Sequence, residues 1–228
     1  LSGLVGSEMC IRDRKNIIKN FNFKNEENKE VWSTFKTLSY EPPECLGAYV
    51  ISMTASASDI LSVSFLQKEA NIKYKLRVVP LFETLDDLIN SKSIMQTLFS
   101  QKWYRKLIQN KQEVMIGYSD SGKDAGKMCA SWHQYKAQEE IVKLAKKFNI
   151  EVIFFHGRGG SAGRGGGPIQ ATLRSLPPNS VNGKIRITDQ GEVIQQKYGY
   201  EPLAKYNLCS YIGAVTAVSY THLTLPTI

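Results

Sequence analysis

Residues 150–168 read IEVIFFHGRGGSAGRGGGP, so that a short apolar segment runs directly into a glycine-rich loop. The apolar part, 150–155, has the length and composition of a β-strand that is buried on both faces. A short helix is expected after the loop, ending near Pro177 and Pro178. A buried strand, a loop and a helix in this order form the unit from which parallel α/β sheets are built.

The same unit recurs along the rest of the chain. Short apolar strands that alternate with helices favour parallel pairing, and two architectures fit: an open doubly wound sheet or part of a (β/α)8 barrel. Thr84 is the expected cap of the helix at 85–99, and Ser56 or Ser58 that of the helix at 60–70. The expected strands are 48–53, 76–79 (ended by Pro80), 113–116, 150–155 and 184–188, and the other expected helices are 15–38, 122–148, 191–197 and 201–213.

The two ends of the chain do not continue this pattern. Residues 1–14 (LSGLVGSEMCIRDR) lack the apolar core of a signal peptide, and residues 218–228 (VSYTHLTLPTI) also differ from what precedes them. Both resemble sequencing-adapter DNA translated in frame. We interpret them as an artefactual leader and tail, and we expect residues 15–217 to form the folded domain.

Composition excludes several classes of protein. The 228 residues contain 42% hydrophobic residues and no uninterrupted apolar run of the length that a membrane span needs. The four cysteines are far apart and form no CxxC pair, which argues against a disulfide scaffold or a zinc ribbon and favours reduced thiols in a cytoplasmic protein. The net charge of +8 favours anionic partners, either nucleic acid or small phosphates and carboxylates.

Polar residues follow the expected strands at the points where the strands end. The carboxyl ends of parallel strands share one edge of a sheet, so these residues can meet in one pocket. The carboxylates of Glu83 and Asp120 are suited to a hard cation, Mg²⁺ or Mn²⁺, although either residue alone could be a helix cap or a surface charge. Lys123 can reach the same pocket. His156 could serve the pocket or merely pack beside it.

The glycine-rich loop favours an ordered anion-binding site. Seven of the chain's 17 glycines lie within 157–167, where Arg158 and Arg164 supply fixed positive groups. Two other functions are weighed: a dinucleotide fingerprint, Gly157-x-Gly159-x-x-Ala162 with Asp189, and an RGG-type RNA-binding tract over 157–167. A flexible linker would not need two arginines six residues apart. The P-loop pattern is absent.

The interior of the chain resembles phosphoenolpyruvate carboxylase. The matching stretches stand in the family's order and cover most of 45–216, which implies an α/β fold that is an incomplete (β/α)8-type barrel. The glycine-arginine motif and YSDSGKDAG are highly specific. The matching stretches are YVISMTASASDIL (49–61), VVPLFETLDDL (78–88), VMIGYSDSGKDAG (114–126), FHGRGGSAGRGGGP (155–168) and ITDQGEVIQQKYG (187–199).

The resemblance implies a function and a role for each matching residue. The family carboxylates phosphoenolpyruvate with bicarbonate, through carboxyphosphate and a metal-bound enolate, to give oxaloacetate and inorganic phosphate. Glu83 and Asp120 match the carboxylates that hold Mg²⁺ or Mn²⁺. Arg158 matches the arginine that grips the substrate phosphate, and Gly159, Gly160 and Gln190 complete the expected substrate contacts. Arg164 matches the loop arginine that the carboxylation steps need and is also expected to bind substrate. Lys123 and His156 match polar residues placed near bicarbonate, and all three are expected to be catalytic.

This sequence departs from the family pattern in ways that limit the expectation. The family's catalytic histidine in a TAHPT motif has no counterpart here, and five of eight barrel strands are expected. An unclosed barrel exposes strand edges, which predicts poor folding and no activity for these residues alone. We expect the complete enzyme to be a homo-oligomer, a tetramer in the family, that binds neither nucleic acid nor membrane. The alternative function is RNA binding through 157–167.

Overall fold

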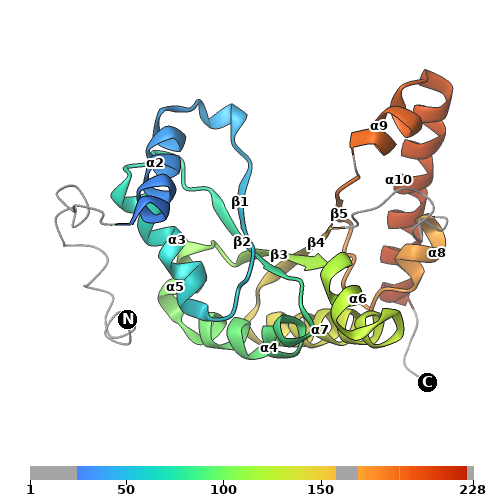
Figure 1. Ribbon diagram of the computed structural model, residues 1–228. Coiled ribbons are helices and arrows are strands. Elements are labelled where there is room, and N and C mark those ends of the chain that lie inside the picture. Colours follow the sequence, from blue (N-terminus) through green and yellow to red (C-terminus); the bar gives the residue numbers. More distant parts are fainter. Residues whose placement is uncertain (1–24, 158–168, 190, 225–228) are drawn as a thin grey trace.

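The computed structural model describes residues 25–157, 169–189 and 191–224 (Figure 1). Its strands form one sheet in the order β1-β2-β3-β4-β5, and every neighbouring pair is parallel. The elements are α2 (Glu26–Tyr40), η3 (Pro43–Cys45), β1 (Ala48–Ile51), α3 (Ala57–Glu69), β2 (Arg77–Phe82), α4 (Leu85–Ser100), α5 (Lys102–Leu107), β3 (Lys111–Gly117), α6 (Ser119–Ala125), α7 (Lys127–Phe148), β4 (Glu151–Gly157), α8 (Ile169–Arg174), β5 (Arg186–Ile187), α9 (Gly191–Tyr198) and α10 (Glu201–Thr224).

The strand order decides between the two architectures left open by the sequence. A doubly wound sheet reverses its strand order at a switch point, whereas these strands follow one another in chain order. Right-handed crossovers in that order place the helices on one face of the sheet, as in a barrel. The prediction of an incomplete (β/α)8-type barrel is therefore confirmed, and the described residues form a half-barrel.

Helix caps fix the connections that follow β1 and β2. Ser56 and Thr84 each begin a helix in a capping box, with Asp59 and Asp87 as the acidic partners three residues on. Thr84 Oγ1 accepts a hydrogen bond from Asp87 N at 3.1 Å. The expected caps at these two positions are confirmed. These caps set where the polypeptide turns away from the sheet after β1 and after β2, and hence where the residues after β2 lie.

Several elements differ from the expectation: β5 covers only Arg186–Ile187, α10 continues beyond 213 to Thr224, and α5 was not expected. Two further differences have a local physical reason. Strand β2 continues through Pro80, because its pairing with β1 ends at Pro80 and its pairing with β3 begins at Leu81, so the missing N–H falls where the neighbours change. The helix expected at 122–148 is two helices. Gly126, at φ 75° and ψ 158°, separates α6 from α7, because this backbone conformation cannot continue a helix.

The main core lies between the sheet and its helices. Helices α4 and α7 lie side by side across one face of the sheet (Figure 1). Phe82, Val114, Ile116 and Phe154 pack from the strands into this core, all at most 1% exposed. Alternate residues of the same strands therefore face the other, concave side. A smaller core around Leu173 holds α8 against α10.

Three further observations concern the described residues as a whole. None of the helices in the described ranges is both long and apolar enough to cross a membrane. Cys45, Cys129 and Cys209 are free thiols. Helix α10 runs without a break across residue 217, and Val218 is buried against α8 and its neighbours. The assignment of 1–14 and 218–228 as artefacts stays a prediction.

Candidate active site at the carboxyl ends of the strands

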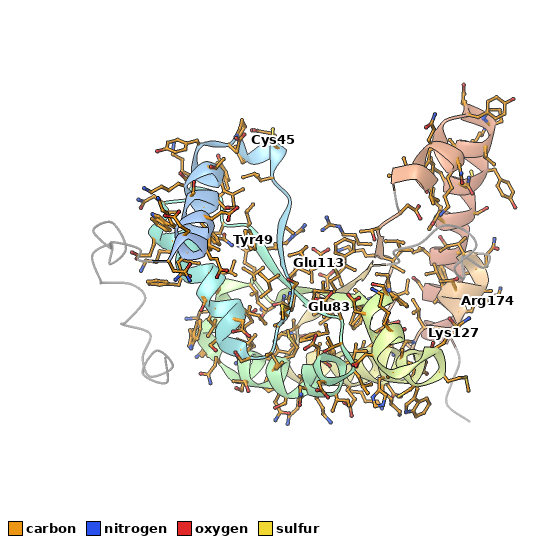
Figure 2. All side chains as sticks on the ribbon, in the orientation of Figure 1. Cys45, Tyr49, Glu83, Glu113, Lys127 and Arg174 are labelled. Carbon is orange, nitrogen blue, oxygen red and sulfur yellow. The ribbon has the colours of Figure 1, made fainter. Side chains whose placement is uncertain are left out.

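Glu83 follows β2 and lies directly beside the end of β3. A Cβ atom added to Gly117, the last residue of β3, would lie 2.6 Å from Glu83 Cβ and 3.0 Å from Glu83 Cα. Only glycine allows this approach without a displacement of Glu83. The close packing of the two strand ends thus fixes the backbone from which the Glu83 carboxylate extends, at the centre of the molecule (Figure 2).

Asp120 reaches the same position from the turn after β3. Burial raises the pKa of Glu83, and repulsion by Asp120, together with a side-chain hydrogen bond to it, raises this pKa further. The Met53 N–H, 3.5 Å from Glu83 Oε1, opposes the rise. Two carboxylates from different strand ends therefore influence each other at this edge of the sheet, and their role as a metal-binding pair stays a prediction.

Buried hydrogen bonds hold the turn that carries Asp120. Gln134 of α7 donates from Nε2 to the Gly117 carbonyl at 3.2 Å and to Ser121 Oγ at 2.8 Å. Gln134 and Ser121 are both buried. These bonds tie the end of β3 and the first turn of α6 to the helix behind them. The sequence gives no local signal for this role, because Gln134 lies 14 residues from Asp120.

Lys123 lies beside Asp120 and neutralises part of its charge. Lys123 Nζ is 3.0 Å from Asp120 Oδ1, and the lysine side chain is 77% exposed. Asp120 lies inside α6 rather than at its N-cap, which is Tyr118, so the alternative that Asp120 merely caps the helix is wrong. The lysine stem is long and its ammonium is exposed, so the ammonium can reach an anion that binds near Asp120.

His156 is buried near the end of β4, paired in register with Ile116. Its side chain is 2% exposed, and its Nδ1 lies 2.8 Å from the Tyr118 hydroxyl. The His156 carbonyl accepts a hydrogen bond from Thr188 N at 3.1 Å, which links β4 to the end of β5. The structure thus places His156 at the expected edge of the sheet, and its role there stays a prediction.

The carboxylate pair suits a divalent cation. Within the described ranges no group of three or more His, Cys, Asp or Glu side chains could hold a metal ion, and Glu83 and Asp120 are a group of two. Mg²⁺ and Mn²⁺ accept such sites, because they keep water ligands and take oxygens from substrate. A bound cation would relieve the repulsion by Asp120 that contributes to the raised pKa of Glu83.

Several expected site residues lie outside the described residues. Arg158, Gly159, Gly160 and Arg164 belong to 158–168, and Gln190 is likewise outside. The RGG tract and most of the dinucleotide fingerprint fall in the same range. Asp189, the acidic member of that fingerprint, is described: its Oδ1 lies 2.8 Å from Lys197 Nζ.

A half-barrel with a carboxylate pair at the carboxyl ends of its strands is typical of metal-dependent α/β-barrel enzymes. Comparison with known proteins gives the particular family. The family model described as phosphoenolpyruvate carboxylase matches residues 8–227. The chain therefore belongs to the phosphoenolpyruvate carboxylase family, as its motifs predicted.

Individual relatives agree with this membership. The chain is 54% identical over 191 residues to the C4 phosphoenolpyruvate carboxylase of Flaveria trinervia, covering 84% of this chain and 20% of that protein. It is 56% identical over 186 residues to the phosphoenolpyruvate carboxylase of Acinetobacter baylyi, covering 82% of this chain and 21% of that protein. The chain thus spans about a fifth of the length of these relatives.

Proposed function

We propose that this chain is part of an enzyme that carboxylates phosphoenolpyruvate with bicarbonate to give oxaloacetate and inorganic phosphate. The observation that supports this most directly is the approach of Glu83 and Asp120 at the carboxyl edge of the sheet, in a chain of the carboxylase family. A divalent cation held by this pair would supply a Lewis acid next to the reacting oxygens. We propose Mg²⁺ or Mn²⁺, because the donors are hard oxygens.

The proposed reaction forms and breaks bonds in two stages. A bicarbonate oxygen attacks phosphorus, and the bond from phosphorus to the enol oxygen breaks, which gives carboxyphosphate and the enolate of pyruvate. Carboxyphosphate then loses its carbon–oxygen bond to phosphate and releases carbon dioxide. The electron pair of the enolate methylene carbon forms the new carbon–carbon bond with carbon dioxide, and oxaloacetate results.

We assign the chain's residues according to the charge that moves in these stages. Arg158 would bind the substrate phosphate with its bidentate guanidinium, with Gly159, Gly160 and Gln190 beside it, and Arg164 would stabilise the anions of the carboxylation stage. Lys123 is suited to hold bicarbonate, because its exposed ammonium lies next to Asp120. His156 would place its polar imidazole ring at the same edge, where the Tyr118 hydroxyl holds the ring through Nδ1.

The test compares two isosteric substitutions in the complete protein that contains this sequence. Glu83→Gln and Asp120→Asn should each lower the rate of bicarbonate-dependent oxaloacetate formation by about 10²–10³, because each removes one charged group from the site. Asp86→Asn is the matched control, since Asp86 is an exposed carboxylate three residues from Glu83. Full activity in either site variant would refute the proposed site.

The 228 residues alone should form no oxaloacetate. The described half-barrel supplies one carboxylate pair and leaves the sheet unclosed at β1 and β5. A closed, dry site is required, since carboxyphosphate and the enolate both react with water. Measurable bicarbonate-dependent turnover by the purified 228-residue chain would contradict this expectation.

A further inference from the structure

A groove of about 510 Å³ lies on the helical side of the sheet, toward the amino ends of β2 and β3. Where it meets β2 and β3, the groove lies at the opposite end of these strands from Glu83. Its walls come from α3, the end of α4 and α5, and its floor includes the first residues of β2 and β3. The lining is largely apolar, with partly exposed side chains from Leu61, Phe65, Leu76, Trp103 and Leu107.

Hydrogen bonds join both walls of the groove to the sheet. Gln67 of α3 accepts from Leu76 N at 2.8 Å and donates to Leu76 O at 3.2 Å, which ties α3 to the chain entering β2. On the other side, the Tyr104 hydroxyl donates to Gln112 Oε1 at 2.7 Å, which ties α5 to β3. Both walls are thus fixed to the sheet, and the apolar surface between them is preformed.

One end of the groove carries positive charge without a matching carboxylate. Lys68 is the last residue of α3 that lines the groove, and Lys75, which precedes β2 in the chain, also lines it. Among the described residues, no carboxylate lies within 4.0 Å of either ammonium, whereas Arg77 and Lys111 are paired with Glu113 and Glu151. An occupant that lies along α3 would meet two unpaired cations at this end.

We propose that the groove binds a helical segment of the same, longer polypeptide, with an apolar stripe toward α3 and α5 and carboxylates at the end that meets Lys68 and Lys75. The groove runs along α3 from Ala57 to Lys68, about 16 Å at 1.5 Å per residue, which is the length of three helical turns. The relatives are about five times longer than this chain, so most of their polypeptide lies outside it.

This occupant explains both the shape and the charge of the groove. An amphipathic helix buries a stripe of apolar side chains of this width, and its carboxyl end carries a partial negative charge that two lysines would favour. The proposal concerns packing at the far end of the strands. It is independent of the proposed reaction.

The test uses overlapping 18-residue peptides that cover the Acinetobacter baylyi relative outside its matched fifth. The 228-residue chain is fused to maltose-binding protein for solubility, and a cooperative thermal unfolding transition of its own is required before use. It is then titrated into each labelled peptide, and binding is followed by fluorescence anisotropy. We expect binding by one stretch of peptides with apolar residues three and four apart and carboxylates at one end. The Lys68→Glu/Lys75→Glu variant should weaken this binding at least tenfold, and lysines in place of the peptide's carboxylates should restore it.

Matched variants separate this result from general charge effects. Lys146→Glu/Lys205→Glu changes the net charge equally on α7 and α10, at exposed lysines outside the groove, and should leave binding unchanged. Leu61→Glu should abolish binding, with thermal melting as the check on folding. The proposal is overturned if no peptide binds, if binding is insensitive to the groove variants, or if the groove variants instead abolish self-association of the chain in sedimentation, which would identify a second copy as the occupant.

Discussion

Replacing Gly117 with alanine tests whether the approach of two strand ends sets the geometry of the proposed metal site. The new Cβ would lie 2.6 Å from Glu83 Cβ and 3.0 Å from Glu83 Cα, whereas carbon atoms in contact prefer about 3.5–4.0 Å. Glu83 must therefore move by roughly 1 Å, and its backbone moves with it. A shift of that size at a reacting centre costs about 10²-fold in rate.

The measurement is Mn²⁺ affinity by electron paramagnetic resonance in the complete protein, alongside oxaloacetate formation. We expect Gly117→Ala to weaken Mn²⁺ binding by about 10–100-fold, as loss of a group that orients a ligand does. Gly122→Ala is the matched control, because nothing lies within 4 Å of the added Cβ and alanine favours a helix by roughly 0.5–1 kcal/mol. Wild-type Mn²⁺ affinity in Gly117→Ala would refute the argument that this contact positions Glu83.

Three further predictions concern stability. Burial raises the pKa of Glu83, so the ionised form of Glu83 destabilises the metal-free fold. Glu83→Gln should therefore have a higher melting temperature than wild type at pH 8, and this difference should vanish as the pH falls below the ordinary carboxyl pKa. A difference in melting temperature that stays constant with pH would count against the reasoning. Gly126→Ala should lower the free energy of unfolding by about 1–3 kcal/mol in denaturant titration, because φ 75° is strained for alanine; an unchanged midpoint would argue against a rigid break between α6 and α7. Gln134→Leu leaves the Gly117 carbonyl and the Ser121 hydroxyl without the Gln134 amide as donor, and should lower the free energy of unfolding by about 1–3 kcal/mol. A variant as stable as wild type in calorimetry would mean that water replaces the amide.

Local sequence patterns predicted most of the elements, because each pattern reflects an interaction within a few residues. The capping residues Ser56 and Thr84 mark helix starts through hydrogen bonds with the residue three positions further along the chain. Errors arose where a partner strand or a backbone angle decided the outcome. Pro80 is tolerated inside β2 because the neighbouring strand changes there, and the break at Gly126 depends on its φ of 75°. Neither is visible in a run of apolar residues.

The candidate site likewise contains residues that local patterns predicted and residues that they did not. The types of residue that follow each strand, Glu83 after β2 and Asp120 after β3, are readable in the chain, and parallel pairing predicts that they share an edge. The residues that hold them were not predicted. Gly117 acts through a contact between two strand ends, and Gln134 acts from α7, the next helix along the chain. Such contacts join residues far apart in the chain, so no local pattern reports them.

The sequence by itself determined the family and the parallel alternation of strands and helices, because specific motifs and hydrophobic periodicity are local properties. Tertiary structure alone decided that the strands lie in chain order and that Glu83 packs against Gly117. It alone also showed the groove that Lys68 and Lys75 line. The physical reason is that packing and the approach of like charges depend on distances between elements, which the order of residues does not specify.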